Sequence, residues 1–143
     1  MTVAATVTAL QTVHAAISGV NTAPTAMPSN LNTATMPIVL TMPGPGTWRP
    51  QAIDLLRRCE RTYTVRCYVS PVGQDKAGPE NAITAINPML DAFGQAYLAD
   101  ITLSGAVDTI TSITDTGVTT LQWAGIDHWG FEFQLAIVEK TAA

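Results

Sequence analysis

Apolar residues recur every three or four positions in two stretches of the chain, which is the spacing of one face of an α-helix. The first stretch comprises Val3, Val7, Leu10, His14 and Ile17. Gly19 follows it, at the place where a helix often ends in a left-handed residue. The second stretch comprises Ile83, Ile86, Leu90, Phe93 and Tyr97. Pro79 and Glu80 suit its first turn, and Pro88 predicts either a kink or two short helices.

Five segments have the composition or the alternation of β-strands. They are residues 37–42, 63–69, 109–113, 118–123 and 129–137. We expect the first strand to end in an unpaired loop, Pro43-Gly44-Pro45-Gly46, and the second to end at Pro71 and Gly73. Asp115-Thr116-Gly117 predicts a hairpin turn between the third and fourth strands, and residues 124–128 predict the connection to the fifth.

The fifth strand has the clearest pattern, because large apolar residues occupy every second position. These residues are Trp129, Phe131, Phe133, Leu135 and Ile137, with Glu132 and Gln134 on the opposite face. Residues 51–61 predict a short helix or an irregular arm, and residues 20–35 a long connection that is functional or held by a neighbour. The order of elements predicts an α+β fold over residues 1–143: a single, mostly antiparallel sheet with two main helices packed on one face.

Charged residues make up only 13% of the 143 residues, against about 25% in a typical soluble domain. A surface so poor in charge favours association of the chain with its own copies. A monomer with a neutral Thr, Ser and Asn surface is the alternative. The net charge of −4 disfavours a general nucleic-acid binder. No apolar run is long enough to cross a membrane, and residues 1–18 lack the basic residue and uninterrupted apolar run of a secretory signal, so we expect the chain to fold in the cytoplasm.

The chain contains no motif typical of nucleophilic hydrolases, nucleotide-binding loops or dinucleotide-binding folds. Cys59 and Cys67 lack the short paired spacing of a zinc site, and Cys67 is expected to be a small buried hydrophobe. We expect His14 to be a hydrogen-bonded core histidine, and Asp127 and His128 to be polar turn residues. The sequence therefore predicts no catalytic, metal-binding or cofactor-binding residues.

Five of the seven basic residues fall within eighteen positions, and all five are arginines. Only Asp54 and Glu60 oppose them, which gives this segment a charge of +3 and leaves −7 for the remainder. The candidate subunit-interface residues are Trp48, Arg49, Arg57, Arg58, Arg61 and Arg66. A solvated face and a nucleic-acid patch are alternatives. We favour a contact between this basic segment and an acidic face of the next identical subunit, which closes into a ring if the rotation allows it.

Three segments carry a resemblance to the tail terminator proteins of long-tailed phages, together with the order and size of the elements. They read MPIVLTMPGPGTW, RTYTVRCYVSPV and GVTTLQWAGIDHWGFEFQLAIVEK. The resemblance implies a structural virion protein that is neither an enzyme nor a cofactor binder. Its subunits would form a ring, expected to be hexameric, that ends polymerisation of the tail tube and joins the tail to the head.

The same resemblance implies four partners: other copies of the chain, the tail-tube protein, a head-completion or neck protein, and genomic DNA. The DNA would pass through the lumen of the ring without sequence-specific binding, and no membrane is involved. A head-closure, neck or tail-tube protein of the same virion is an alternative. More remote alternatives are a small α+β ligand-binding domain and an enzyme that uses Asp127 and His128.

Overall fold

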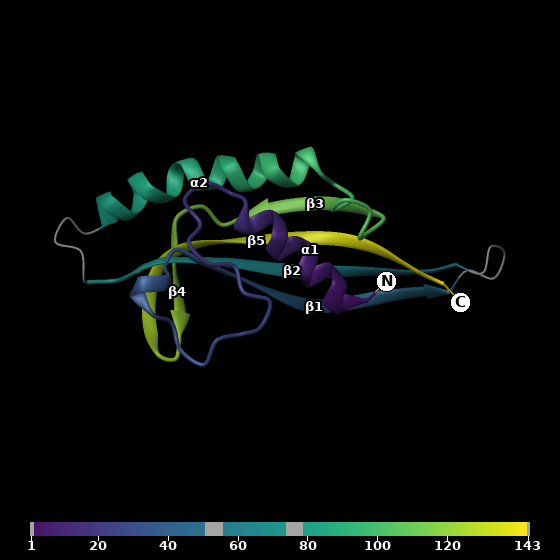
Figure 1. The fold of residues 1–143 in the computed structure, drawn as a ribbon, viewed down its shortest axis with the longest axis horizontal. Helices are drawn as coiled ribbons and strands as arrows, with labels where there is room; N and C mark the ends of the chain where they lie inside the picture. The colour runs from purple at the N-terminus through teal and green to yellow at the C-terminus, as the bar shows by residue number, and fades with distance from the viewer. Residues whose placement is uncertain (1, 51–55, 74–78, 143) are drawn as a thin grey trace.

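The computed structural model describes residues 2–50, 56–73 and 79–142 (Figure 1). The elements are α1 (Val3–Ala15), a 3-10 turn (Thr33–Thr35), β1 (Ile38–Pro50), β2 (Leu56–Pro71), α2 (Pro79–Ala99), β3 (Thr109–Asp115), β4 (Thr119–Trp123) and β5 (Ile126–Ala142). The strands form one sheet and both helices contact it, which confirms the predicted α+β fold. No helix among the described residues is both long and apolar enough to cross a membrane.

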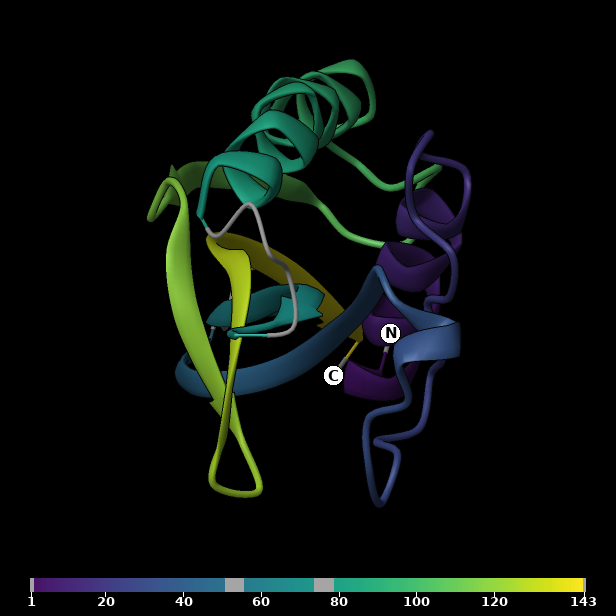
Figure 2. The same cartoon turned by 90° about the vertical axis from the view of Figure 1, so that its left-hand side faces the viewer.

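The sheet is built around β5, which pairs antiparallel with β2 along one edge. β1 lies beyond β2, so the strand order is β1-β2-β5-β3, with β4 also pairing with β5. The three longest strands, β1, β2 and β5, extend together to one end of the molecule (Figure 1). The β4–β5 hairpin lies at the other end, where it turns away from α2 (Figures 1 and 2).

The expectation that β1 ends at Pro43 is wrong. Pairing with β2 shifts register between Pro43 and Gly46 and then continues to Pro50. A bulge lets an edge strand absorb residues that cannot pair regularly, and prolines are tolerated at that position. The predicted helix or irregular arm at 51–61 is wrong for residues 56–61, which belong to β2. Residues 51–55 lie outside the described part of the chain.

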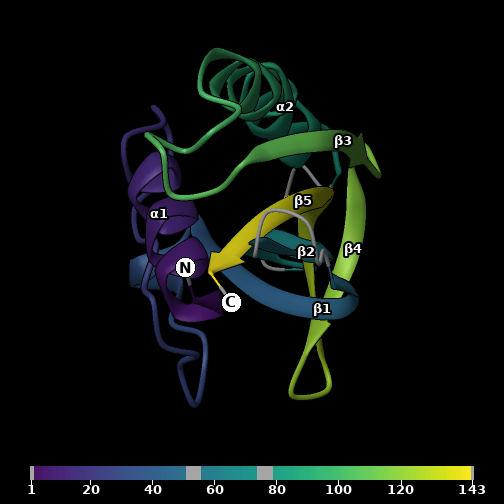
Figure 3. The same cartoon turned by 90° about the vertical axis from the view of Figure 1, so that its right-hand side faces the viewer.

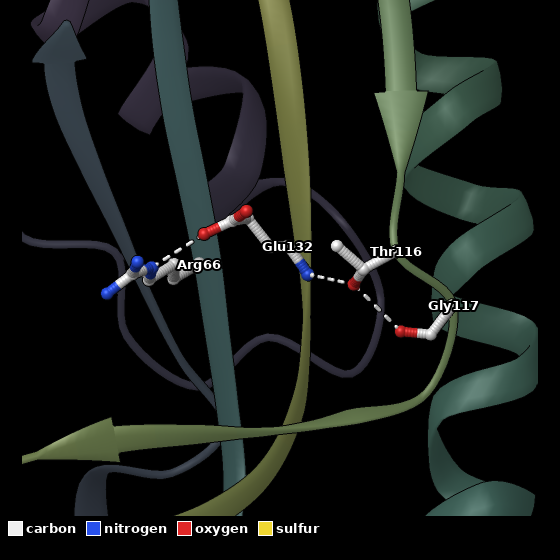
Figure 4. A network of polar contacts seen from close by, with 4 residues as sticks. All are labelled: Arg66, Thr116, Gly117 and Glu132. Atoms are coloured by element: carbon white, nitrogen blue, oxygen red, sulfur yellow. Dashed lines mark hydrogen bonds and ion pairs between the residues drawn. The ribbon is translucent and has the colours of Figure 1, made fainter.

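The hairpin predicted between the third and fourth strands is also wrong, because β3 and β4 do not pair with each other. Both pair with β5, β3 through residues such as Asp115 opposite Phe133 and β4 through Thr119 opposite Gly130. Between them, the Thr116 amide donates to Glu132 O at 3.0 Å, and Thr116 Oγ1 accepts from the Glu132 amide at 3.1 Å (Figure 4). Residues 116–118 therefore form a corner that keeps the chain beside β5.

The tight turn lies later than expected, at Ala124 and Gly125, whose φ values are +51° and +82°. Two consecutive residues with positive φ are typical of the type I′ turn that joins two antiparallel strands. The sequence predicted a connection at residues 124–128 but not this two-residue turn within it, because alanine rarely adopts a positive φ. Asp127 and His128 therefore lie in β5 and not in a connection.

The main core lies between the sheet and both helices. Its fully buried aromatic residues are Tyr63, Phe93, Tyr97, Phe131 and Phe133. α2 is one uninterrupted helix through Pro88, so of the two alternatives predicted there, a kink or two short helices, the second is wrong. Of the apolar stripe predicted for α2, Ile86, Phe93 and Tyr97 are buried, whereas Ile83 is exposed.

A buried polar network ties α1 to the rest of the core. His14 Nε2 lies 2.6 Å from the hydroxyl of Tyr97, and His14 Nδ1 lies 2.7 Å from Gln11 Oε1. Gln11 Nε2 donates to the carbonyl oxygens of Pro24 at 2.6 Å and Val39 at 2.8 Å. The prediction that His14 is a hydrogen-bonded core residue is confirmed. The same glutamine holds the long connection against β1, as the sequence led us to expect.

A smaller cluster covers part of the other side of the sheet. It consists of Ile38, Leu40, Tyr68 and Leu121, with Leu31, Met36 and Trp123 packed against it. Tyr68 follows Cys67 directly, and successive strand residues point to opposite faces. β1 and β2 are therefore buried on both faces at one end of the sheet, although only one face was expected to be apolar.

Candidate subunit interface

The predicted arginine segment forms the far end of the β1–β2 pair, which we call the basic tip: residues 46–50 of β1 and 56–61 of β2. In this tip Trp48 pairs with Cys59, and Arg49 pairs with Arg58. The backbone of Arg57 pairs with Pro50 in the same tip, but its side chain lies outside the described part of the structure. Since alternate residues share a face, Trp48 and Arg61 lie on one face of the tip, and Arg49 and Arg58 on the other.

Arg61 is seated on the bulge of β1. Its Nη1 donates to the carbonyl oxygen of Gly44 at 2.8 Å, and its guanidinium carbon lies 6.0 Å from the centre of the Trp48 ring. A Cβ on Gly46 would come within 2.9 Å of that guanidinium carbon. A Cβ on Gly44 would lie 2.6 Å from the carbonyl oxygen of Thr62. Gly46 therefore leaves room for the guanidinium of Arg61, and Gly44 allows the close approach of the β2 backbone at Thr62.

On the other face of the tip, Arg49 and Glu60 are exposed, whereas Arg58 is half-buried. Arg49 Nε lies 3.9 Å from Glu60 Oε1, and the two side chains are 63% and 55% exposed. An exposed pair at that distance contributes little to stability. On the first face of the tip, beside Arg61, Trp48 is 58% exposed. An exposed tryptophan beside several arginines has the composition found at the centres of protein interfaces.

Arg66 lies apart from the basic tip, in the middle of β2. Its Nε lies 2.7 Å from Glu132 Oε1 on β5, directly opposite in the sheet (Figure 4). The hydrogen bond to Glu132 raises the pKa of Arg66 above its usual value, and partial burial opposes that rise. The structure therefore brings together Trp48, Arg49, Arg58 and Arg61, but it binds Arg66 within the subunit.

A buried carboxylate at the base of the tip was not anticipated. Glu139 is nearly inaccessible and pairs with Cys59 across β2 and β5. Its Oε1 accepts hydrogen bonds from Tyr63 and, at 2.9 Å, from Thr6 of α1. Burial, followed by the bond to Glu139, raises the pKa of Tyr63. This contact joins the start of α1 to the end of β5 (Figure 3), and continuing the alternation of β5 past Ile137 would have placed Glu139 inside.

The other groups considered for chemistry lie in the core. Burial lowers the pKa of His14 to about 3 and raises the pKa of the Cys67 thiol and the Tyr97 hydroxyl. All three side chains are therefore neutral near pH 7. Cys59 and Cys67 are free and buried. Among residues 2–50, 56–73 and 79–142, no group of three or more His, Cys, Asp or Glu side chains could hold a metal ion.

Asp127 and His128 do not form a pair. Asp127 is exposed, whereas His128 is buried, with its Nδ1 3.0 Å from the carbonyl oxygen of Ile126 and its ring 5.5 Å from that of Tyr68. Their positions follow from the alternation of β5, in which neighbours point to opposite faces. The pair therefore lacks the mutual contact that an acid–base dyad requires.

Two surface hollows are lined by described residues. One, of about 470 Å³, lies between α1 and β1 and includes Val3, Val7, Met27 and Pro43. The other, of about 320 Å³, lies between the end of α1 and α2 and includes Gly19, Pro37 and Met89. Neither lining contains a charged or titratable side chain. The residues that line these hollows therefore include no group for acid–base catalysis.

No protein-family model and no curated protein matches this chain. The interpretation of its function therefore depends on the fold, the basic tip and the resemblance carried by the three sequence segments.

Proposed function

We propose that this protein is a structural subunit of a phage virion that assembles into a ring, ends growth of the tail tube and joins the tail to the head. The main structural support for this proposal is the basic tip. It presents an exposed tryptophan and a seated arginine at the extremity of the sheet, outside the core. Such a surface favours binding to another protein, because arginine and tryptophan are the residues most often dominant in interfaces.

The arrangement of titratable groups supports a structural role rather than a catalytic one. His14, Cys67 and Tyr97 are buried in neutral form, and Asp127 and His128 point apart. The role in a tail terminator comes from the resemblance. In that role the partners are the tail-tube protein, a head-completion or neck protein and DNA that moves through the lumen, and the site of action is the neck of the virion.

The proposal is tested by electron microscopy and light scattering of the purified protein. We expect closed rings with one subunit number over a wide range of concentration. Rings that stack into tubes would assign the protein to the tail tube instead. A chain that stays monomeric when concentrated would overturn the proposal and favour a ligand-binding domain.

A matched pair of variants connects the test to the basic tip. Arg49→Glu with Arg58→Glu reverses the charge of one exposed and one half-buried side chain, and should abolish rings while circular dichroism stays unchanged. Asp91→Arg changes an exposed charge on α2 and should leave rings intact. Rings that persist in the first variant would remove the basic tip from the interface.

A further inference from the structure

Arg61 and Trp48 share one face of the basic tip but differ in their access to a partner. The Trp48 side chain projects into solvent, whereas Arg61 is half-buried and its Nε is inaccessible to water. The other two guanidinium nitrogens are engaged within the subunit. Nη1 donates to the carbonyl oxygen of Gly44 at 2.8 Å, and Nη2 donates to Cys59 Sγ at 3.7 Å. The hydrogen-bonding groups of this arginine are therefore directed into its own subunit.

The Trp48 ring rests on this arginine. The guanidinium carbon of Arg61 lies over the ring, 6.0 Å from its centre, which is within the range of a cation–π contact. Among the described residues, Trp48 belongs to neither of the two apolar clusters. A side chain that is already held in one orientation loses less conformational entropy when a partner binds it.

We infer that Arg61 is a positioning residue, which holds the Trp48 ring in the orientation that a partner subunit binds and makes no contact with that partner itself. This inference rests on the proposed function and gives the two residues of one face different roles. Trp48 supplies the contact, and Arg61 acts only through Trp48. Arg49 and Arg58 point to the opposite face of the tip and take no part in this arrangement.

Gly46 provides a way to displace Arg61 without changing any charge. A Cβ at this position would lie 2.9 Å from both the guanidinium carbon and Nη2 of Arg61. In Gly46→Ala the guanidinium therefore shifts from its place over the Trp48 ring, although the arginine is retained. A partner that recognised only the charge of Arg61 would still bind this variant.

A double-mutant cycle between the two residues tests the inference. Trp48→Ala should weaken assembly by about a hundredfold, as expected for an aromatic anchor. Arg61→Met should weaken it by about tenfold, because the ring is present but no longer held. The double variant should assemble no worse than Trp48→Ala, since no ring remains to be positioned. Light scattering measures the protein concentration at which half of the subunits are assembled.

Three further variants separate orientation from charge and from stability. Arg61→Lys keeps the charge but loses the planar guanidinium, so it should weaken assembly about as much as Arg61→Met. Gly46→Ala should also weaken assembly by about tenfold. Arg66→Met is the matched control, because it removes an arginine of β2 that pairs with Glu132 inside the subunit, and it should assemble normally.

The cycle and the controls decide the inference. A tenfold loss from Arg61→Met that persists in the absence of Trp48 overturns it and gives Arg61 a direct contact, while the proposed function stands. Normal assembly of Trp48→Ala or Gly46→Ala also overturns it, as does an equal loss in Arg66→Met, which would attribute the effect to stability.

The proposed function can fail separately. If the wild-type protein forms open filaments and the cycle gives the expected values, the inference is supported and only the proposed function is rejected. A wild-type protein that remains monomeric when concentrated overturns both.

Discussion

The main core and the basic tip are parts of one sheet with opposite physical characters. In the core, Phe93 stacks on His14 and Phe133, with ring centroids 5.4 and 5.8 Å apart, and all three side chains are buried. In the tip, the one described ion pair is exposed and spans 3.9 Å. This difference arises because the strands continue past the helices. Side chains at the strand ends are therefore exposed and add little to the free energy of unfolding.

The largest expected difference in the cost of a substitution is between two glycines, one in the core and one in the basic tip. A Cβ on Gly130 would collide with the carbonyl oxygen of Cys67, which is backbone and cannot move alone. We expect Gly130→Ala to cost more than about 4 kcal/mol of unfolding free energy or to prevent folding. In Gly46→Ala, the guanidinium of Arg61 can move aside, so the cost should be about 1 kcal/mol, the value of its hydrogen bond to Gly44. Urea denaturation measures both, and equal losses would contradict the contrast.

The next contrast is between two aromatic residues. Phe93→Ala should cost about 3–5 kcal/mol, because it leaves a cavity among packed rings. Trp48→Ala should change stability by less than about 0.5 kcal/mol, since most of its ring already contacts water. The measurement is made at protein concentrations low enough for subunits to be dissociated. A large loss in Trp48→Ala would place the tip within the folding core.

The core should also respond to pH through His14. Its pKa falls from 6.5 in the unfolded chain to about 3 in the folded one, so only the unfolded chain takes up a proton as the pH drops below 6.5. Above pH 6.5 the free energy of unfolding does not depend on the protonation of His14. Below pH 6.5 it decreases by about 1.4 kcal/mol per pH unit.

Denaturation at pH 6.5 and at about pH 5 should therefore differ by about 2 kcal/mol in the wild-type protein. His14→Leu should be less stable at both values but should lose most of this difference. If the variant kept the full pH dependence, the decrease would belong to other groups. The arginines of the tip stay charged over this range and should contribute nothing to it.

The smallest expected difference in the cost of a substitution is between two arginines. Arg66→Met breaks a 2.7 Å pair with Glu132, whose side chain is mostly buried, and should cost about 1 kcal/mol after screening by solvent is allowed for. Arg49→Met removes an exposed pair and should cost less than about 0.5 kcal/mol. If Arg49→Met impairs assembly and Arg66→Met does not, Arg49 acts in the contact between subunits and Arg66 stabilises the fold of one subunit.

Much of the fold could be predicted because its signal is local. The stripes of Leu10 to Ile17 and of Ile86 to Tyr97 lie within a few turns of one helix, and the alternation of Phe131 to Ile137 lies within one strand; Val3 and Val7, at the start of the first stripe, are only half-buried. These patterns indicate which face of a helix or strand is buried, whichever element packs against that face. The errors concerned pairing: β1 beyond Pro43, the placement of β3 and β4 along β5, and the turn at Ala124.

The candidate site was predicted only in part, for the same reason. The sequence alone determined that five arginines are close along the chain, that the surface is poor in charge and that the core is apolar. Only the tertiary structure decided that Arg61 contacts the bulge at Gly44 and Gly46, and that Arg66 pairs with Glu132. It also decided that the basic tip and the β4–β5 hairpin lie at opposite ends of the molecule. Burial periodicity is a property of neighbouring residues, whereas strand register and ion pairing join residues many positions apart and depend on the energy of the whole sheet.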